Sequence, residues 1–366
     1  METFAICSPA VKIIFPESFT QKFFFNEENI FVGLLTVPVK NIKKKEIDNK
    51  VVVRVKAFSC NYRDRMLLSL FNTRCNEIGN TDKFCYSPFG SDFVAEVIEC
   101  GKQVHGLKIG DRVIPDSSYP FKKASDKLGG IPTNYASQRI HVFDENQLIK
   151  IPESMPDEIA AAFTITAQTS YSIIRKLNLK PKENILITAP SSNTSLSLIK
   201  FLQNIDVNVF ALASNLLHKK ELQELGVTDV LQISNFSNKT IFELTGGKYF
   251  NAVFDPFFNI YMEKVFPAIG FSGRYITCGL APDYNELNGI KNFSELMENS
   301  IVRNISIIGN CLGTTNDLEN ALMDFENEKY NIIIDSVYTG NDILPFLQKS
   351  FGILPRFGKV VYKYQS

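Results

Sequence analysis

The stretch "ILITAPSSNTSLSLIKFL", residues 185–202, has the residue types of a phosphate-binding turn. A branched apolar run leads into a loop of small polar residues, and the loop leads into a segment with helical apolar spacing. Such a helix directs its first backbone N–H groups and the positive end of its dipole at the loop, which favours an anion. Dinucleotide loops usually carry three glycines and this loop has none, so two alternatives stand: a working cofactor site or its remnant.

The next apolar run, "VNVFALA" (207–213), indicates which nucleotide would be bound. Sheets that bind NAD place an acid at the end of this strand, about 20 residues past the loop, to hold the ribose 2′-OH. Here the first acid is Glu221, and Ser214 occupies the place where a small hydroxyl contacts a 2′-phosphate. Three basic residues follow: His218, Lys219 and Lys220. The pattern favours NADPH over NADH, although exposed helix lysines are an alternative explanation for the positive charges.

The composition limits the class of protein. The 366 residues suit two domains, and 45% hydrophobic with 21% charged residues is typical of globular chains. Lys+Arg and Asp+Glu both count 39, so neither a nucleic-acid partner nor a membrane surface is expected. The chain has no long apolar run and no signal-like N-terminus, and its seven cysteines are never paired as CxxC. We therefore expect a cytoplasmic protein with reduced thiols.

These residues need elements that position them. Before Pro152, many short strands punctuated by Gly and Pro predict an irregular barrel. After Pro152, a long helix over 157–177 precedes alternating strands and helices, which predicts a doubly wound parallel sheet. The tail from residue 317 predicts helix, strand, helix and strand, and we expect it to return to the first domain.

The order of several motifs resembles that of the medium-chain dehydrogenases/reductases. The stretches are "AFSCNYRDRMLL" (57–68), "PFGSDFVAEVIECGKQVHGLKIGDRVIP" (88–115), "NAVFDP" (251–256), "FSGRYITCG" (271–279) and "FGKVVYK" (357–363). The resemblance implies an α/β protein in which a GroES-like irregular β-barrel domain is split around a Rossmann doubly wound parallel sheet. It places the catalytic domain in residues 1–152 and 312–366 and the NADPH-binding domain in 153–311. It also implies a homodimer or homotetramer.

Zinc separates the branches of this superfamily. The alcohol-dehydrogenase branch has Cys at the position of Asn61, His at the position of Ser91, and a cysteine-rich lobe where this chain has the cysteine-free segment 114–130. Catalytic zinc needs about three N, S or O protein ligands, so we expect no metal. Cys75, Cys85 and His105 are the other set of residues that could be considered as a metal site, and free thiols are the simpler explanation for the two cysteines. The chain is more similar to the zinc-free quinone and enoyl reductases, which share the "NYRD" motif at 61–64.

The serine loop, residues 189–195, replaces the family's glycines by small residues at Ala189, Ser192 and Ser195. Its polar side chains are candidate phosphate donors: Ser191, Ser192, Asn193, Thr194 and Ser195. These residues could also simply cap the helix, and capping is compatible with phosphate contact. We therefore predict a working NADPH site.

The resemblance also implies roles around the reacting atoms. Hydride addition to an α,β-unsaturated carbonyl forms an enolate, which needs hydrogen-bond donors and then a proton. Tyr62 is the candidate acid, Asn61 could orient the carboxamide or the substrate, and Arg63 with Asp64 is expected to be a structural pair. Residues that resemble the family's nicotinamide contacts are Thr169, Cys278, Gly279, Gly309 and Asn310.

The substrate is the least specified part. The "SSNTSL" loop (191–196) in a zinc-free chain is similar to reductases of lanthipeptide maturation, which implies reduction of dehydroalanine to D-alanine in a modified peptide. A small-molecule quinone or enoyl-thioester reductase is the enzyme alternative. A cofactor-poor scaffold protein is the non-enzyme alternative, and fold alone decides none of these.

Overall fold

The computed structural model describes residues 1–38, 47–78, 85–120, 129–279 and 293–365. The chain divides into two compact units: unit 1 comprises residues 1–165 and 334–366, and unit 2 comprises residues 166–333. The domain bounds expected from the sequence, at 152 and 311, differ from these. The chain first passes from unit 1 to unit 2 after residue 165, within helix α3 (Asp157–Leu177). Helix α9 (Thr315–Glu326) belongs to unit 2, where Asp317 is bonded to Arg175.

Unit 1 is built from two mostly antiparallel sheets. The smaller has the order β2-β3-β1-β5 and the larger the order β16-β17-β4-β6-β7-β9, with β8 paired to β4. The smaller sheet contains β1 (Glu2–Cys7), β2 (Phe19–Phe25), β3 (Glu28–Thr36) and β5 (Tyr86–Pro88). The larger contains β4 (Lys50–Ser59), β6 (Asp92–Cys100), β7 (Arg112–Pro115), β8 (Ile140–Asp144), β9 (Leu148–Lys150), β16 (Ile334–Thr339) and β17 (Lys359–Lys363). The helices assigned wholly to unit 1 are α1 (Val11–Ile14), α2 (Asp64–Ile78) and α10 (Ile343–Ser350).

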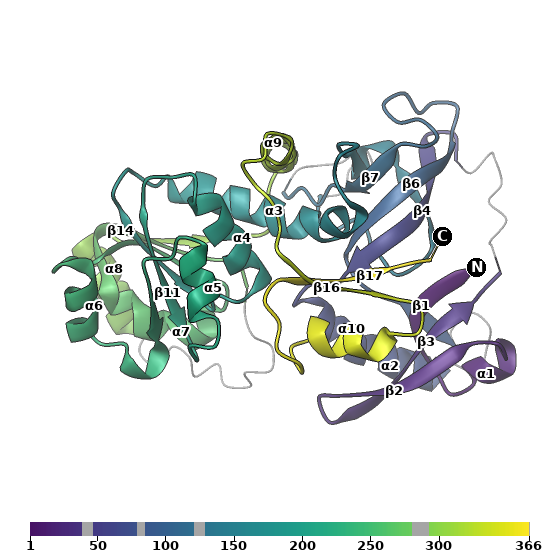
Figure 1. The fold of residues 1–366 in the computed structure, drawn as a ribbon, viewed down its shortest axis with the longest axis horizontal. Coiled ribbons are helices and arrows are strands. Elements are labelled where there is room, and N and C mark those ends of the chain that lie inside the picture. Colours follow the sequence, from purple (N-terminus) through teal and green to yellow (C-terminus); the bar gives the residue numbers. More distant parts are fainter. Residues whose placement is uncertain (39–46, 79–84, 121–128, 280–292, 366) are drawn as a thin grey trace. The chain divides into compact units, whose positions relative to one another are not determined.

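Aromatic rings from both ends of the chain form the centre of the unit 1 core. Phe4, Phe58, Phe346 and Tyr362 lie at centroid separations of 5.0–5.9 Å. Burying one such side chain contributes about 1.5–3 kcal/mol. Strand β17 also pairs with β4. The tail returns to this unit from residue 334 onward, whereas the helix that begins the expected tail, α9, belongs to unit 2. Figure 1 shows the yellow α10 and β17 among elements of the first 165 residues.

Helix α2 lies in a part of the chain that the sequence analysis describes as mostly strand. It has fifteen residues and begins with Asp64. Its buried apolar side chains, Leu68, Phe71 and Cys75, are spaced as one face of a helix. The following strand β5 leads through Pro88 to Ser91, so α2 and the start of β6 flank the same polar cluster.

Unit 2 is a six-stranded parallel sheet with the order β12-β11-β10-β13-β14-β15. Its strands are β10 (Asn184–Thr188), β11 (Asn208–Ala213), β12 (Asp229–Gln232), β13 (Phe250–Asp255), β14 (Ile269–Thr277) and β15 (Ser306–Gly309). Its further helices are α4 (Asn193–Leu202), α5 (Lys219–Glu224), α6 (Asn238–Thr245), α7 (Phe258–Val265) and α8 (Phe293–Arg303). The predicted doubly wound sheet is confirmed.

The strand order of unit 2 locates a ligand site. The chain moves outward from β10 to β12 and then returns to β13 on the other side of β10. In open α/β sheets, ligands bind outside the carboxyl ends of the strands at such a switch point. The serine loop leaves the carboxyl end of β10 there. In the described part of the chain, no helix has both the length and the apolar character needed to cross a bilayer.

Candidate functional site

Five polar side chains of unit 1 form a cluster, here called the Asn61 centre: Asn61, Asp64, Ser91, Asp92 and Lys359. Asp64, Ser91 and Asp92 are 0% exposed, and Lys359 is 1% exposed. They come from the end of β4, the start of α2, the start of β6 and strand β17. In the sequence, Lys359 stands out only as part of the "FGKVVYK" motif, and the structure places it in this cluster.

The side-chain amide of Asn61 is held on both sides. Its Nδ2 donates to Ser91 Oγ at 3.0 Å and to Asp92 Oδ2 at 2.9 Å. Its Oδ1 accepts from Lys359 Nζ at 2.8 Å. Both amide hydrogens and the carbonyl oxygen are therefore used within the centre, which fixes the orientation of the amide. That Asn61 orients the carboxamide or the substrate stays a prediction.

The carboxylate of Asp64 connects the centre to the backbone. It accepts from the Asn61 backbone N–H and from Ser91 Oγ, each at 2.8 Å. Burial raises the pKa of Asp64, while these hydrogen bonds and the charge of Arg63 oppose the rise. The expected Arg63–Asp64 contact is present, with Arg63 Nη1 at 3.3 Å. Because Asp64 also begins α2, the helix and the turn at residues 61–63 are tied together.

Tyr62 follows Asn61 in this turn and is partly exposed. The guanidinium carbon of Arg65 lies 5.2 Å from the centroid of its ring and 5.0 Å from that of Phe25. A cation over an aromatic face is attractive, so Arg65 helps to set the direction of the ring. The proton-donating role of Tyr62 stays a prediction.

In unit 2, the serine loop contains a left-handed backbone conformation although it has no glycine. Ala189 adopts φ +43°, the left-handed region that glycine normally supplies. The helix begins at Asn193, and Ser192 is its N-cap, accepting from Ser195 N at 3.3 Å. Ser195 is 0% exposed and donates to Thr188 O at 2.9 Å. Small side chains thus keep the turn tight where glycines are replaced.

The candidate phosphate donors differ in exposure. Ser191 is exposed, and Ser192, Asn193 and Thr194 are partly exposed at the first turn of α4. Ser192 Oγ donates to Ser195 Oγ at 2.9 Å. Ser192 therefore caps the helix by accepting from Ser195 N, as the second explanation of these residues supposes. The N–H groups of the first helical turn still point toward the loop.

The candidate 2′-phosphate residues lie after β11. Ser214 is exposed directly beyond the strand, and His218 is partly exposed. Lys219 Nζ is 2.8 Å from Asp229 Oδ1, and Lys220 Nζ is 3.8 Å from Glu224 Oε1. Both lysines thus have acidic neighbours, and Ser214 lies at the end of the strand as predicted from the sequence.

A buried carboxylate beneath the loop was missed by the sequence analysis. Asp255, at the end of β13, is 0% exposed and accepts from Thr188 Oγ1 and Tyr275 OH at 2.7 Å each and from Phe257 N at 2.9 Å. Burial raises its pKa, although each of these donors opposes the rise. The bonds join the carboxyl ends of β10, β13 and β14. The only sequence signal was an acid at the end of an apolar strand.

The candidate nicotinamide contacts lie at the same edge of the sheet or on α3. Cys278 is half-buried just past β14, and burial raises the pKa of its thiol to about 12. Asn310, just past β15, accepts from Ser172 Oγ at 2.8 Å and donates to Leu312 O at 2.9 Å. Gly279 O accepts from Phe258 N at 3.4 Å. Thr169 is buried on α3. The parallel register aligns Thr277 with Gly309, which brings Cys278 and Asn310 together.

Comparison with known proteins identifies the family. Residues 47–153 match the family described as "Alcohol dehydrogenase GroES-like domain", and residues 195–327 match "Zinc-binding dehydrogenase". The chain belongs to the medium-chain dehydrogenase/reductase superfamily. The predicted fold class, a GroES-like domain with a Rossmann sheet, is confirmed. Members of this superfamily are oxidoreductases that use a nicotinamide cofactor.

Individual relatives are distant. The chain is 22% identical to the acryloyl-coenzyme A reductase of Metallosphaera sedula, over 76% of this chain and 81% of that protein. It is 26% identical to a quinone oxidoreductase of Pseudomonas aeruginosa, over 46% of this chain and 48% of that protein. A crystal structure of an NAD-dependent alcohol dehydrogenase covers 99% of both chains with a TM-score of 0.76 and 20% identity. That of CurK enoyl reductase covers 91% of this chain and 95% of its own, with a TM-score of 0.67 and 17% identity.

The residues of this superfamily member fit a dinucleotide but do not fit zinc. The serine loop, the first turn of α4 and the carboxyl edge of the sheet supply the small residues and N–H groups that a pyrophosphate requires. At the two ligand positions of the zinc branch, the Asn61 centre instead has an amide and a hydroxyl. Its two carboxylates, Asp64 and Asp92, already accept hydrogen bonds within the centre, and Asp92 is paired with the Lys359 ammonium. Neither an amide nor a hydroxyl is a usual zinc ligand. Among the described residues, no group of three or more His, Cys, Asp or Glu could hold a metal; residues 121–128 of the cysteine-free segment lie outside them.

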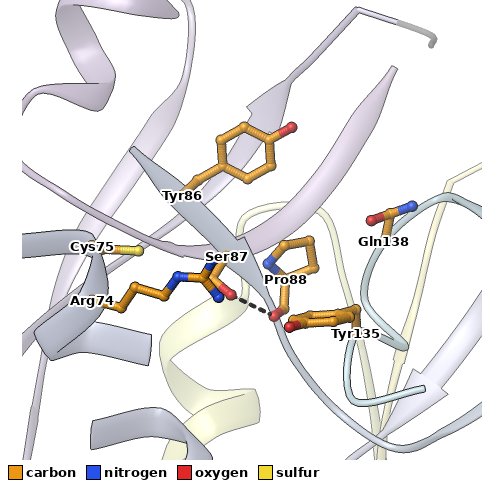
Figure 2. A pocket seen from close by; sticks show the side chains of 7 residues that line it. All are labelled: Arg74, Cys75, Tyr86, Ser87, Pro88, Tyr135 and Gln138. Atoms are coloured by element: carbon orange, nitrogen blue, oxygen red, sulfur yellow. Dashed lines mark hydrogen bonds between the residues drawn. The ribbon is translucent and has the colours of Figure 1, made fainter. Parts of the chain in front are cut away.

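Unit 1 also has a separate surface pocket of about 230 Å³, shown in Figure 2. Seven residues line it: Arg74, Cys75, Tyr86, Ser87, Pro88, Tyr135 and Gln138. Within it, Ser87 Oγ donates to Pro88 O at 3.2 Å. None of these lining residues belongs to the Asn61 centre, so we do not assign the pocket to the reaction.

Proposed function

We propose that the chain is an NADPH-dependent reductase of a carbon–carbon double bond conjugated to a carbonyl group. The observation that carries this proposal is the Asn61 centre, where a buried ammonium is found among side chains that do not suit zinc. Alcohol oxidation through a metal-bound alkoxide needs ligands for a Lewis acid, which an amide and a hydroxyl at the two ligand positions do not provide. Reduction of an activated alkene needs only hydride, hydrogen-bond donors and a proton. The names of the acryloyl-coenzyme A reductase and CurK enoyl reductase relatives support the same chemistry.

The protein's part in this reaction is to bind, orient and protonate. A bound nicotinamide supplies the hydride. The first turn of α4 would hold the pyrophosphate, and Ser214 with His218 and Lys219 would hold the 2′-phosphate. Hydride addition at the β-carbon leaves negative charge on the carbonyl oxygen, and Tyr62 would then supply the proton to the α-carbon.

Dehydroalanine within a peptide is the proposed substrate, because the "SSNTSL" loop resembles that of lanthipeptide reductases. The product would be D-alanine, formed when the proton arrives from one face. An acryloyl thioester is the second candidate, favoured by the named relative that covers most of this chain. Both compounds have a terminal methylene conjugated to a carbonyl, so the same hydride geometry serves both. A quinone is a third acceptor that the relatives' names support.

The test is incubation of the protein with NADPH and three acceptors: a dehydroalanine peptide, an acryloyl or enoyl thioester, and a quinone. With deuterated NADPH, the saturated product of the alkene should be about 3 Da heavier than the substrate, against about 2 Da with the ordinary cofactor, because one deuteride and one solvent proton are added. The label should be found on the β-carbon. Reduction of the thioester or the quinone alone would reject the peptide proposal. Failure to consume NADPH with any acceptor would favour the scaffold alternative.

A further inference from the structure

Lys359 is a fully buried cation surrounded by oxygen atoms. Its Nζ donates to Asn61 Oδ1 at 2.8 Å, Ser59 Oγ at 3.1 Å, Asp92 Oδ2 at 3.2 Å and the Cys60 carbonyl at 3.3 Å. Its side chain and that of Asp92 are each 1% exposed. Lysine is almost never buried so completely unless an opposite charge and hydrogen bonds compensate for the lost water. Both compensations are present here.

The charges of the centre explain why a cation is needed. Asp64 and Asp92 are both 0% exposed and share the neighbourhood of Asn61. Asp64 Oδ1 is paired with Arg63 Nη1 at 3.3 Å, whereas the cation paired with Asp92 is Lys359. The other carboxylate oxygen of Asp92 accepts from Ile165 N at 3.1 Å. Removing the ammonium would leave one buried negative charge uncompensated.

We propose that the Lys359 ammonium takes the place of the metal ion in the Asn61 centre. In the zinc branch, a thiolate and an imidazole at the positions of Asn61 and Ser91 are arranged around a metal. Here the Asn61 amide oxygen, the Ser59 hydroxyl, the Cys60 carbonyl and an Asp92 carboxylate oxygen are arranged around an ammonium group of this chain. Ser91 is linked to this group through Asn61. A fixed positive charge among these oxygens repels a divalent cation, so the site is closed to metal.

Lys359 is thus a positioning residue. By bonding both the Cys60 carbonyl and the Asn61 side chain, it fixes the two sides of the peptide that leads to Tyr62. This inference concerns unit 1 alone and holds whichever acceptor is reduced. Its tests need no substrate, so its failure and a failure of the proposed function are separable.

The first measurement compares two lysine variants of the full chain in urea. Lys359→Met removes the charge and keeps most of the volume. Lys363→Met makes the same change four residues along β17, where the side chain is 40% exposed and its acidic neighbours lie at 3.5 and 3.9 Å. We expect Lys359→Met to lower the urea midpoint by roughly 1 M and Lys363→Met to leave it nearly unchanged. Equal midpoints for the two variants would overturn the inference.

The second variant, Lys359→Met with Asp92→Asn, separates charge from packing. In this double variant, the Asn61 side-chain amide can turn, so that its oxygen accepts a hydrogen bond from the amide nitrogen introduced at position 92. The amide oxygen introduced at position 92 still accepts from Ile165 N. Both variants carry the same methionine, so a loss caused by packing would persist in the second. We expect the double variant to regain most of the lost urea midpoint; no recovery would contradict a cationic role.

Metal content gives the third measurement. Wild-type protein should contain far less than one equivalent of zinc, and treatment with chelator should not change its urea midpoint. One equivalent of zinc that is lost to chelator, together with a lower midpoint, would overturn the replacement of metal by Lys359.

Discussion

At the scale of the residue, Tyr62→Phe tests the proposed acid. The change removes a hydroxyl and keeps the ring that contacts Arg65. General acid catalysis contributes typically 10²–10⁴-fold, so we expect turnover to fall by about that factor. The dissociation constant of NADPH should stay nearly constant, because the candidate cofactor residues are in unit 2. Steady-state kinetics and a binding titration together provide the measurement.

A matched control is Tyr135→Phe, the same change at a tyrosine of unit 1 that lines the pocket of Figure 2. It should retain wild-type turnover. If Tyr62→Phe behaves like this control, the α-proton comes from another group, and Tyr62 is a packed tyrosine of the turn.

At the scale of the element, Asp255 joins the carboxyl ends of three strands under the serine loop. Its pKa is raised by burial, so the folded protein binds this proton more tightly than the unfolded chain. The stabilising contribution is therefore present below the ordinary carboxyl pKa of about 4 and is lost as pH rises through the raised value. Each unit of the rise corresponds to about 1.4 kcal/mol of unfolding free energy.

Asp255→Asn should remove this pH dependence. The amide oxygen can accept from Thr188 and Phe257, and the amide nitrogen can donate to the Tyr275 hydroxyl, which then acts as acceptor. In urea unfolding measured from acidic to neutral pH, the unfolding free energy of the variant relative to that of wild type should increase as pH increases. The exposed Asp206, paired to Lys182 at 2.8 Å, provides the control Asp206→Asn, which should follow wild type. A difference between Asp255→Asn and wild type that is constant with pH would show that Asp255 ionises normally.

The sequence predicts elements better than it predicts the cluster they build. Apolar runs such as β4 and β6 and the alternation after Pro152 are local patterns, and they were predicted correctly. Helix α2 was missed because its buried face is interrupted by polar residues and follows a strand-rich region. Lys359 appeared only as one residue of an apolar strand motif. Its partners Asn61 and Asp92 are 298 and 267 residues away, and no local pattern can show that they meet.

At the scale of the whole molecule, cofactor binding and folding are linked. Unit 1 is formed from both ends of the chain, and unit 2 is inserted between them. A ligand that binds only the folded protein stabilises it by RT ln(1 + [L]/Kd), which is about 2.7 kcal/mol at 100 times Kd. This makes cofactor preference measurable without any substrate. The homodimer or homotetramer stays a prediction, for which sedimentation provides the test.

NADPH should raise the melting temperature more than NADH at equal concentration. In the proposed site, the 2′-phosphate would add charge-assisted hydrogen bonds near Ser214, and losing one such bond costs about 1.5–3 kcal/mol, or roughly ten- to a hundredfold in affinity. Ser214→Asp places a negative charge against the phosphate, so it should abolish the preference and leave the stabilisation by NADH intact. Ser234→Asp, at an exposed serine just past β12, should keep the preference for NADPH. Equal stabilisation of wild type by both cofactors would contradict recognition of the 2′-phosphate. No stabilisation by either would mean that the glycine-free loop is a remnant, since a helix terminus that holds pyrophosphate must bind both cofactors.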